Sequence, residues 1–369
     1  MHNIINLIQD VATPHNNVLI REMVRCSGEG VRLWYAKEED VSLYSWKENL
    51  THQYLPATIY GTRLNLKFLW HCITHRNERY LIVGWANINT KLLHLLFFIM
   101  RRPFNHWTDL PDQNSSLITI KKKLVRYLAY SLLKSSKGKV FGVGKTTVEV
   151  FKKWGFTQSK LVNFPIFVDV ENDLSRYHMQ KQAVRTRYGI QSDEFLISAG
   201  SRIVHEKGYD LLLRALATIP APVRSSMKIV LVGKGDQLEL LKVLADDLHL
   251  SNQIVFVDWL SIEEFKLLIA NSNLFLHPAR FDSYGGTTLA MSLGVPVIGS
   301  KTAGAAYDRI DDGVNGFLYE AEDFQHLATL ILQIFEDTDL RSRMAVAAHQ
   351  TALMWHPQRG VETLNKELI

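Results

Sequence analysis

The sequence predicts an α/β protein with two domains, each built on an open parallel β-sheet. The chain has 369 residues, which at about 150 residues per domain favours two domains. In the second half, six short apolar runs alternate with stretches of helical periodicity, and most of these runs end in glycine or charged residues. This alternation is typical of βαβ units in a sheet covered on both faces. We expect the domains to span residues 1–170 and 190–350.

Composition excludes several classes of protein. Hydrophobic residues make up 47% of the chain and charged residues 21%, which excludes a disordered or low-complexity chain. Cys26 and Cys72 are the only cysteines, so a disulfide framework and a four-cysteine zinc site are excluded. No basic segment leads into an apolar one at the start, and the longest apolar run, Leu92–Met100, is too short to span a bilayer. We expect a cytoplasmic protein.

The two halves differ in charge. Residues 1–170 carry 23 Lys and Arg against 12 Asp and Glu, a net charge of +11, whereas residues 171–369 carry 19 against 25, a net charge of −6. This asymmetry predicts different partners for the two halves. The basic half suits anionic lipid, nucleic acid or an acidic substrate.

The elements of the first half follow from short apolar runs separated by helical stretches. Strands are expected at residues 4–8, 31–35, 80–83 and 140–143, and helices around 18–25, 92–100, 117–133 and 147–154. The polar stretch 165–188 lacks strand signals and suits the connection between the domains.

The second half alternates more regularly. Strands are expected at residues 195–199, 228–232, 254–257, 274–277, 295–298 and 316–319, with helices at 209–219, 238–248 and 286–293. The run Ser261-Ile262-Glu263-Glu264 predicts a further helix that begins with a capping box.

Glycines and cations follow successive strands of this second half. Arg202 and Lys207 come after the first strand, Gly233-Lys234-Gly235 after the second and Asp258 after the third, and Arg280–Gly286 follows the fourth. Ligands bind at the carboxyl ends of strands in an open parallel sheet, so these turns converge on one edge. Glycine permits close approach of backbone N–H groups, and Arg and Lys neutralise anions, so this edge suits a phosphate-bearing ligand. Plain turns with a solvated charged edge are the alternative.

These same residues resemble a known family. Gly200–Gly208, Val232–Gly235, Pro278–Ile298 and Asp312–Leu318 resemble, in order and spacing, the motifs of retaining GT-B glycosyltransferases of family 4, also called glycosyl transferases group 1. The resemblance covers residues 195–320. It implies two Rossmann-like domains that face each other across a cleft. Trp355 and His356 resemble the point where the family's chain returns to its first domain, so a final helix at about 351–369 would complete that domain.

The resemblance also implies roles for individual residues. Arg202 and Lys207 would hold the nucleotide diphosphate and stabilise the charge on the leaving phosphate. Asp282 stands at the first acidic position of the family's E-x7-E motif, which contacts donor-sugar hydroxyls. The remaining implied donor-binding residues are Gly200, Ser201, Gly233, Lys234, Gly235, Val257, Asp258, Ser283, Tyr284, Gly285, Gly286 and Thr287.

One position departs from the family pattern. The second glutamate of E-x7-E, which usually bonds the ribose hydroxyls, is replaced by Ala290, and a one-residue gap brings Leu289 there instead. Recognition of the ribose then depends on another group, such as Thr287 or Thr288. A catalytically inactive relative is the alternative that this departure leaves open.

Acceptor and sugar contacts are expected in the first half. In the family, the turn after the first strand lies over the active site, and His15, Asn16 and Asn17 occupy it here. Asn tolerates left-handed geometry, although a simple helix cap explains this turn equally well. His106 is the first catalytic candidate, because family members often have a histidine near this position, at a strand end that faces the cleft, and Asp109 is a second acceptor-side candidate. A structural role is the alternative for any single histidine.

One segment of the first half looks like a nucleotide-binding motif. Val140–Thr147 imitates a phosphate-binding P-loop, but the required glycine is replaced by Lys139, so the sequence predicts a strand and helix instead.

The segment Leu117–Lys139 combines an apolar stripe with a basic face. Alone it suits a core-facing helix with a solvated back. The charge of the whole half favours a peripheral contact with anionic membrane.

We therefore expect a retaining, metal-independent glycosyltransferase. Its partners would be a nucleotide-sugar donor, used as a substrate rather than a cofactor, and a glycan or lipid-linked glycan acceptor. The expected setting is bacterial surface polysaccharide synthesis at the inner face of the cytoplasmic membrane. Neither an Asp-x-Asp pair nor a His/Cys cluster at ligand spacing indicates a metal, and no motif indicates nucleic acid. A nucleotide-sugar epimerase and an inactive partner subunit are the alternatives.

Overall fold

The computed structural model describes residues 4–27, 30–38, 50–85, 87–111, 120–281 and 284–369. The chain divides into two units. Unit 1 is Met1–Phe167 with Pro357–Ile369, and unit 2 is Val168–His356. The sequence had placed the corresponding boundaries at residue 170 and at about residue 351.

Unit 1 contains a seven-stranded sheet of order β3-β2-β1-β4-β5-β6-β7, in which each neighbouring pair is parallel. Its strands are β1 (Ile5–Gln9), β2 (Val31–Tyr35), β3 (Ala57–Ile59), β4 (Arg79–Val83), β5 (Asn105–Thr108), β6 (Lys139–Gly142) and β7 (Leu161–Asn163). The central strands β1 and β4 are mostly apolar and largely buried, as expected of a sheet covered on both faces.

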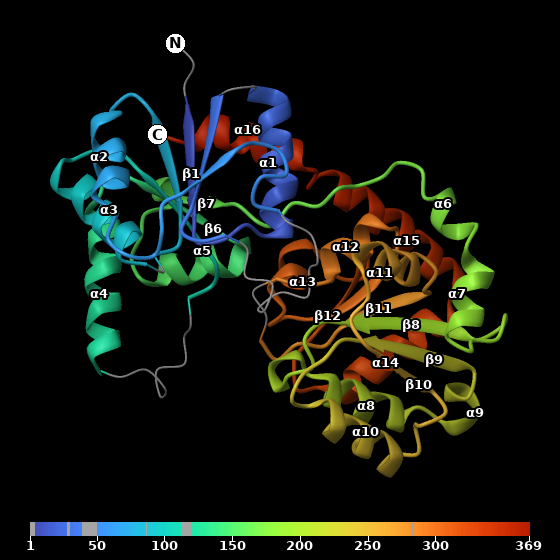
Figure 1. Ribbon diagram of the computed structural model, residues 1–369. Helices are drawn as coiled ribbons and strands as arrows, with labels where there is room; N and C mark the ends of the chain where they lie inside the picture. Colours follow the sequence, from blue (N-terminus) through green and yellow to red (C-terminus); the bar gives the residue numbers. More distant parts are fainter. Residues whose placement is uncertain (1–3, 28–29, 39–49, 86, 112–119, 282–283) are drawn as a thin grey trace. The chain divides into compact units, whose positions relative to one another are not determined.

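Helices cover both faces of this sheet (Figure 1). They are α1 (Pro14–Ser27), α2 (Leu66–Thr74), α3 (Ile88–Ile99), α4 (Ile120–Ser135), α5 (Gly144–Lys153) and α16 (Pro357–Glu367), with a 3₁₀ turn at Gln158–Lys160. Helices α2, α3, α4 and α5 contribute to one shared apolar core, whereas α16 packs against α1. Gly360 allows this close packing, because a Cβ there would lie 2.7 Å from Leu19 and 2.8 Å from Phe167.

Unit 2 contains a six-stranded parallel sheet of order β10-β9-β8-β11-β12-β13. Its strands are β8 (Phe195–Gly200), β9 (Met227–Val232), β10 (Ile254–Val257), β11 (Leu274–His277), β12 (Val297–Ser300) and β13 (Gly316–Tyr319). Both units thus follow the doubly wound strand order, and the predicted fold class is confirmed.

The helices of unit 2 again lie on both faces of its sheet (Figure 1). They are α6 (Ser175–His178), α7 (Lys181–Arg187), α8 (Tyr209–Thr218), α9 (Ala221–Arg224), α10 (Leu238–Asp247), α11 (Ile262–Ala270), α12 (Thr287–Ser292), α13 (Gly304–Arg309), α14 (Phe324–Glu336) and α15 (Thr338–Leu353), with a 3₁₀ turn at His205–Lys207. The predicted capping box is present, since Ser261 accepts from the backbone of Glu264 while the Glu264 side chain accepts from that of Ser261.

Candidate functional site

The topological switch point of unit 2 lies between β8 and β11. These strands are neighbours, yet the chain continues from β8 toward β9 on one side and from β11 toward β12 on the other. The connections therefore diverge at this point, and open α/β sheets bind ligands outside the carboxyl ends of the strands at such a switch point. The loops that follow β8 and β11 carry most of the predicted donor-binding residues.

The loop after β8 is held against the loop after β9 by backbone hydrogen bonds. Ser201 N donates to Val232 O at 3.1 Å and Ile203 N donates to Lys234 O at 2.7 Å. A Cβ on Gly233, whose φ is +141°, would lie 1.9 Å from Ser201 O, and a Cβ on Gly235 would lie 1.9 Å from Ile203 O. These glycines let two loops approach each other, and their expected role of bringing backbone N–H groups close to a ligand stays a prediction.

A third close approach connects the loop after β8 to the loop after β11. Gly208 has a φ of +67°, and a Cβ there would lie 2.1 Å from Pro278 O. Only glycine fits this left-handed position. The contact fixes the preceding Lys207, which is 8% exposed, at the switch point. The Ser201 hydroxyl lies 2.6 Å from the hydroxyl of Tyr209, a residue that the sequence analysis did not single out as part of the site.

Arg202 and Arg280 have different environments at this edge. Arg280 forms paired hydrogen bonds to Asp210 at 2.6 and 2.7 Å and a further one to Glu322 at 2.8 Å. Its charge is therefore used to hold the loop after β11 against the start of α8. The Arg202 side chain is exposed and has no hydrogen bond or ion pair within the described residues. It is a cation available to an anionic ligand.

Lys234 and Asp258 form an exposed ion pair of 2.6 Å at the ends of β9 and β10. The Lys234 hydrogen bond, together with the backbone N–H of Trp259, lowers the pKa of Asp258. Val257, the last residue of β10, accepts a backbone hydrogen bond from Gly233 through its carbonyl. The predicted residues of these two strand ends therefore lie together, with their charges already paired.

Two of the predicted side chains after β11 are engaged by other residues of unit 2. The Tyr284 hydroxyl accepts from Arg309 Nε at 2.8 Å and donates to Asp308 at 3.3 Å, and burial raises the pKa of Tyr284. Thr287 is fully buried, with its hydroxyl 2.8 Å from His277 Nδ1. The side chains of Tyr284 and Thr287 are therefore engaged within unit 2, and their part in donor binding stays a prediction.

The remaining positions of this loop differ in what the structure says of them. Gly286 packs so closely on Phe275 that a Cβ there would lie 2.5 Å from the ring. Gly285 is half-buried. Asp282 and Ser283 lie outside the described residues. Ala290 belongs to a buried apolar cluster, so the position of the family's second glutamate is part of the core here.

The acceptor-side candidates of unit 1 are only partly exposed. Asn17 is 4% exposed and donates to Leu50 O at 3.0 Å and to Gln53 Oε1 at 2.9 Å, so it anchors a neighbouring loop rather than facing a ligand. Asn16 donates to the side chain of Gln9. His15 lies in the first turn of α1 and Asp109 lies just after β5, and both are exposed.

His106 is misplaced in the prediction. It lies inside β5 and is fully buried, with Nδ1 3.0 Å from His94 Nε2 and the ring stacked on Trp85 at 4.6 Å. Burial, and then the neighbouring His94, lowers the pKa of His106 far below its ordinary value. The sequence analysis placed His106 at a strand end that faces the cleft, and this was wrong. His106 is the second residue of β5, on the face of the sheet that packs on α3, which carries His94. Trp85 covers it, and Asn87 caps α3.

The imitation P-loop is a tight turn, as the sequence predicted. Only Val143 separates β6 from α5, so no loop long enough to surround a phosphate is present. In the described part of the chain, no group of three His, Cys, Asp or Glu side chains has the arrangement of a metal site. No helix among the described residues is long and apolar enough to cross a membrane.

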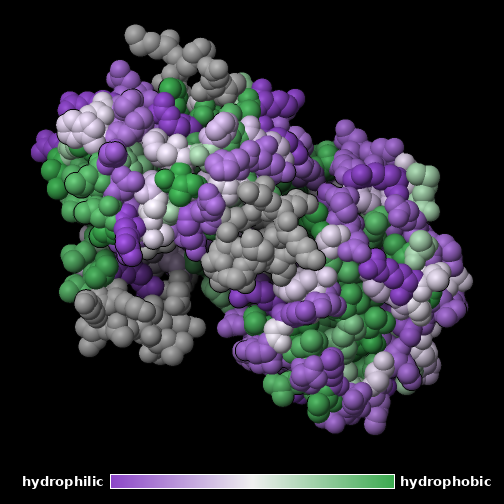
Figure 2. Space-filling model, in the orientation of Figure 1, coloured by the Kyte–Doolittle hydropathy of each residue, from purple (hydrophilic) through white to green (hydrophobic). Residues whose placement is uncertain are grey.

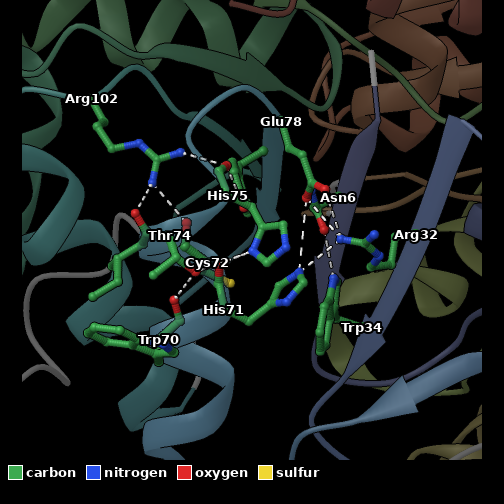
Figure 3. A network of polar contacts seen from close by, with 12 residues as sticks. Asn6, Arg32, Trp34, Trp70, His71, Cys72, Thr74, His75, Glu78 and Arg102 are labelled. Carbon is green, nitrogen blue, oxygen red and sulfur yellow. Dashed lines mark hydrogen bonds and ion pairs between the residues drawn. The ribbon is translucent and has the colours of Figure 1, made fainter. Parts of the chain in front are cut away.

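A second polar network lies at the opposite edge of the sheet in unit 1 (Figure 3). Arg32 donates to Glu78 at 2.9 Å and lies 2.8 Å from His71 Nε2, while Asn6 donates to Glu78 at 2.7 Å. The Trp34 indole donates to Asn6 at 2.9 Å. These residues sit at the amino ends of β1, β2 and β4, away from the ligand-binding edge, and we assign the network to stability.

Comparison with known proteins matches unit 2 to a family. Residues 180–351 match the family described as Glycosyl transferases group 1. A GDP-mannose-dependent alpha-(1-6)-phosphatidylinositol monomannoside mannosyltransferase of Mycolicibacterium smegmatis is 30% identical over 178 residues, which are 46% of this chain and 46% of that protein. The lipopolysaccharide core biosynthesis glycosyltransferase LpsE of Rhizobium meliloti is 27% identical over 168 residues, 45% of this chain and 47% of that protein. The chain thus spans about half the length of these relatives.

Solved structures match the whole chain. Anabaena HepE in complex with UDP superimposes with a TM-score of 0.77 at 20% identity, covering 98% of both chains. WaaG, a glycosyltransferase involved in lipopolysaccharide biosynthesis, superimposes with a TM-score of 0.64 at 16% identity, covering 97% of this chain and 99% of that one. The chain therefore has the GT-B fold, with two Rossmann-like domains.

Proposed function

We propose that this protein is a retaining glycosyltransferase that moves a sugar from a nucleotide diphosphate to a hydroxyl of a glycan or lipid-linked glycan. The proposal includes independence from metal ions. The lipopolysaccharide and mannoside enzymes among its relatives support a setting in bacterial surface polysaccharide synthesis on the cytoplasmic side of the membrane.

The uncompensated cation at the switch point of unit 2 carries the proposal. Arg202 is exposed and has no partner within the described residues, and Lys207 is fixed nearby by the Gly208–Pro278 contact. An unpaired cation at the switch point suits the phosphates of a nucleotide sugar, because their negative charge grows as the sugar leaves. The family match over residues 180–351 supports the same ligand.

The proposed reaction needs no nucleophile from the protein. The bond between the sugar C1 and the diphosphate oxygen breaks, and the acceptor hydroxyl oxygen bonds to C1 on the same face. The acceptor proton passes to the departing phosphate. Arg202 and Lys207 stabilise the charge that develops on that phosphate, and the buried Lys207 is held in place before the reaction begins.

The first test is nucleotide binding. A ligand at a hundred times its dissociation constant stabilises the native state by about 2.7 kcal/mol, which is visible as a higher melting temperature. We expect a shift with one of UDP, GDP and ADP that is lost in Arg202→Ala. The matched control is Arg214→Ala, which removes an exposed arginine on α8, and it should keep the shift. An unchanged shift in Arg202→Ala would refute the donor site.

Turnover tests the rest of the proposal. Transfer from the matching nucleotide sugar should leave the anomeric configuration unchanged, as read by proton NMR of the product, and EDTA should not reduce the rate. Free or inverted sugar released without an acceptor would favour the epimerase. Failure to bind any nucleotide would favour the inactive partner subunit, since Ala290 removes the usual ribose contact.

A further inference from the structure

Unit 1 exposes an unusual number of large apolar side chains on one face. Twelve of the 23 exposed large hydrophobic side chains in the described chain lie between Ile59 and Leu128. Those on helices define what we call the apolar face: Leu66 and Trp70 on α2, Ile88, Leu95, Phe98 and Ile99 on α3, and Leu124, Val125, Tyr127 and Leu128 on α4. The three helices share one core on the same side of the sheet, and Figure 2 shows hydrophobic residues along this edge of the molecule.

Helix α3 shows most directly that this face is not an ordinary surface. Its inner stripe, which includes Leu93, His94 and Phe97, is buried, as expected for a helix that packs on a sheet. Its outer stripe is also apolar, with Leu95, Phe98 and Ile99 exposed by 42%, 37% and 66%. A helix that is hydrophobic all round is normally enclosed by protein or lipid.

Helix α4 extends this surface toward the ligand-binding edge. It follows β5 and precedes β6 in a parallel sheet, so its first turns lie at the carboxyl ends of the strands. Leu124, Tyr127 and Leu128 in these turns are 58%, 70% and 57% exposed. Trp70 on α2, an aromatic residue of the kind that favours a membrane–water interface, is 67% exposed.

The positive charge of unit 1 is concentrated in the same segment. Residues 57–139 carry 14 Lys and Arg but only 3 Asp and Glu, a net charge of +11, which equals the whole excess of residues 1–170. Lys67 and Lys91 are exposed among the apolar side chains of α2 and α3. Three lysines, Lys121-Lys122-Lys123, stand in the first turn of α4.

We propose that the apolar face docks on an anionic phospholipid bilayer, with the helices lying on the surface and their apolar side chains entering the headgroup boundary. A protein partner would account for the apolar residues, and nucleic acid for the cations. A bilayer accounts for both, because lipid tails take the apolar side chains while anionic headgroups attract Lys and Arg at the same depth. The proposal goes beyond sugar transfer and does not rest on it.

Vesicle sedimentation with the full-length protein tests this. We expect binding to vesicles of phosphatidylcholine with about one third phosphatidylglycerol, weak binding to phosphatidylcholine alone, and a loss of binding as salt screens the charges. Leu124→Gln/Leu128→Gln should lower the partition coefficient about tenfold, because two apolar anchors are removed. The matched control is Leu240→Gln/Val243→Gln on α10 of unit 2, where the original side chains are 62% and 59% exposed, and it should bind like the wild type.

Other results would overturn the proposal. These are equal binding by the α4 variant and the wild type, equal binding to neutral and anionic vesicles, or binding to duplex DNA without binding to vesicles. A dimer that forms without lipid and is abolished by Leu124→Gln/Leu128→Gln would assign the face to a second copy of the chain. Both variants should keep the melting temperature and the nucleotide-induced shift of the wild type, so failure of lipid binding is distinguishable from failure of the donor site.

Discussion

Lowering the pH from about 7.5 to about 5 is expected to destabilise unit 1 through two buried histidines. His94 Nδ1 lies 2.6 Å from Thr90 O, so this nitrogen carries the proton, and His94 Nε2 accepts from His106 Nδ1 at 3.0 Å. His106 Nε2 is then an unprotonated nitrogen, buried without a partner in the described chain. Both rings are neutral, and a proton on either would place a charge in an apolar cluster.

The direction follows from the pKa values. Burial lowers the pKa of His94 from 6.5 to about 4, so between these values the unfolded chain binds a proton that the folded chain does not. Stability is therefore complete above about pH 6.5 and decreases as the pH falls toward 4. At pH 5 the loss from His94 alone is about 2 kcal/mol, since each unit of difference contributes about 1.4 kcal/mol. His106, whose pKa is lowered in the same direction, adds to the loss.

Urea unfolding measured by tryptophan fluorescence is a suitable assay, because Trp85 stacks on His106 and reports on this cluster. In His94→Gln, the amide can both donate to Thr90 O and accept from His106, but it does not titrate. We expect the stability lost between about pH 7.5 and pH 5 to be smaller by about 2 kcal/mol in this variant. His326→Gln, at an exposed site on α14, is the control and should keep the wild-type loss. An equal loss in His94→Gln and the wild type would refute this account of the cluster.

Three further predictions concern the glycines, the polar network and the imitation P-loop. Gly233→Ala should destabilise unit 2 by about 3 kcal/mol in urea unfolding and remove the nucleotide-induced shift in melting temperature. The control is Gly313→Ala, at φ +79° with nothing within 4 Å of its Cβ, which should destabilise the protein by about 1 kcal/mol. Equal losses of stability in the two variants would show that the loop contact is unimportant. Glu78→Ala should destabilise unit 1 by about 2 kcal/mol without changing nucleotide binding, because it removes the carboxylate that accepts hydrogen bonds from Arg32 and Asn6. An altered nucleotide shift would contradict a purely structural role. Lys145→Ala should leave nucleotide binding and turnover unchanged in a thermal-shift and transfer assay, and a loss of either would revive the phosphate-binding interpretation.

The sequence predicted the sheet of unit 2 well and that of unit 1 less well. All six strands of unit 2 were expected, with β12 displaced by two residues, because each is an apolar run followed by a turn. In unit 1, β3 and β7 have three residues each, too few for periodicity to appear. Helix α2 was not expected from the sequence, although it is amphipathic.

The loops that form the candidate site were predicted at the right places in the chain, whereas the surroundings of their side chains were not. Spacing and glycines located the loops after β8, β9 and β11 correctly, since these depend on chain order alone. Which side chains face solvent depends on tertiary packing, and so Asn17, His106, Tyr284 and Thr287 are engaged inside the protein. The Tyr209 contact with Ser201 gave no sequence signal beyond its position after Gly208.

The two arginines at the switch point show how one edge can be both rigid and receptive. Arg280 is neutralised by Asp210 and Glu322, and those bonds hold the loop after β11 in place before any ligand arrives. Arg202 has no carboxylate within the described residues to neutralise it, so an incoming anion displaces only water from it. An anion at Arg202 therefore gains attraction without breaking an ion pair, and the contacts made by Arg280 and Gly208 are already formed before binding. Removal of Arg202, rather than of Arg280, is therefore the cleaner test of ligand binding. We expect Arg202→Ala to leave the fold intact, whereas removal of Arg280 would release two carboxylates and the loop that they hold.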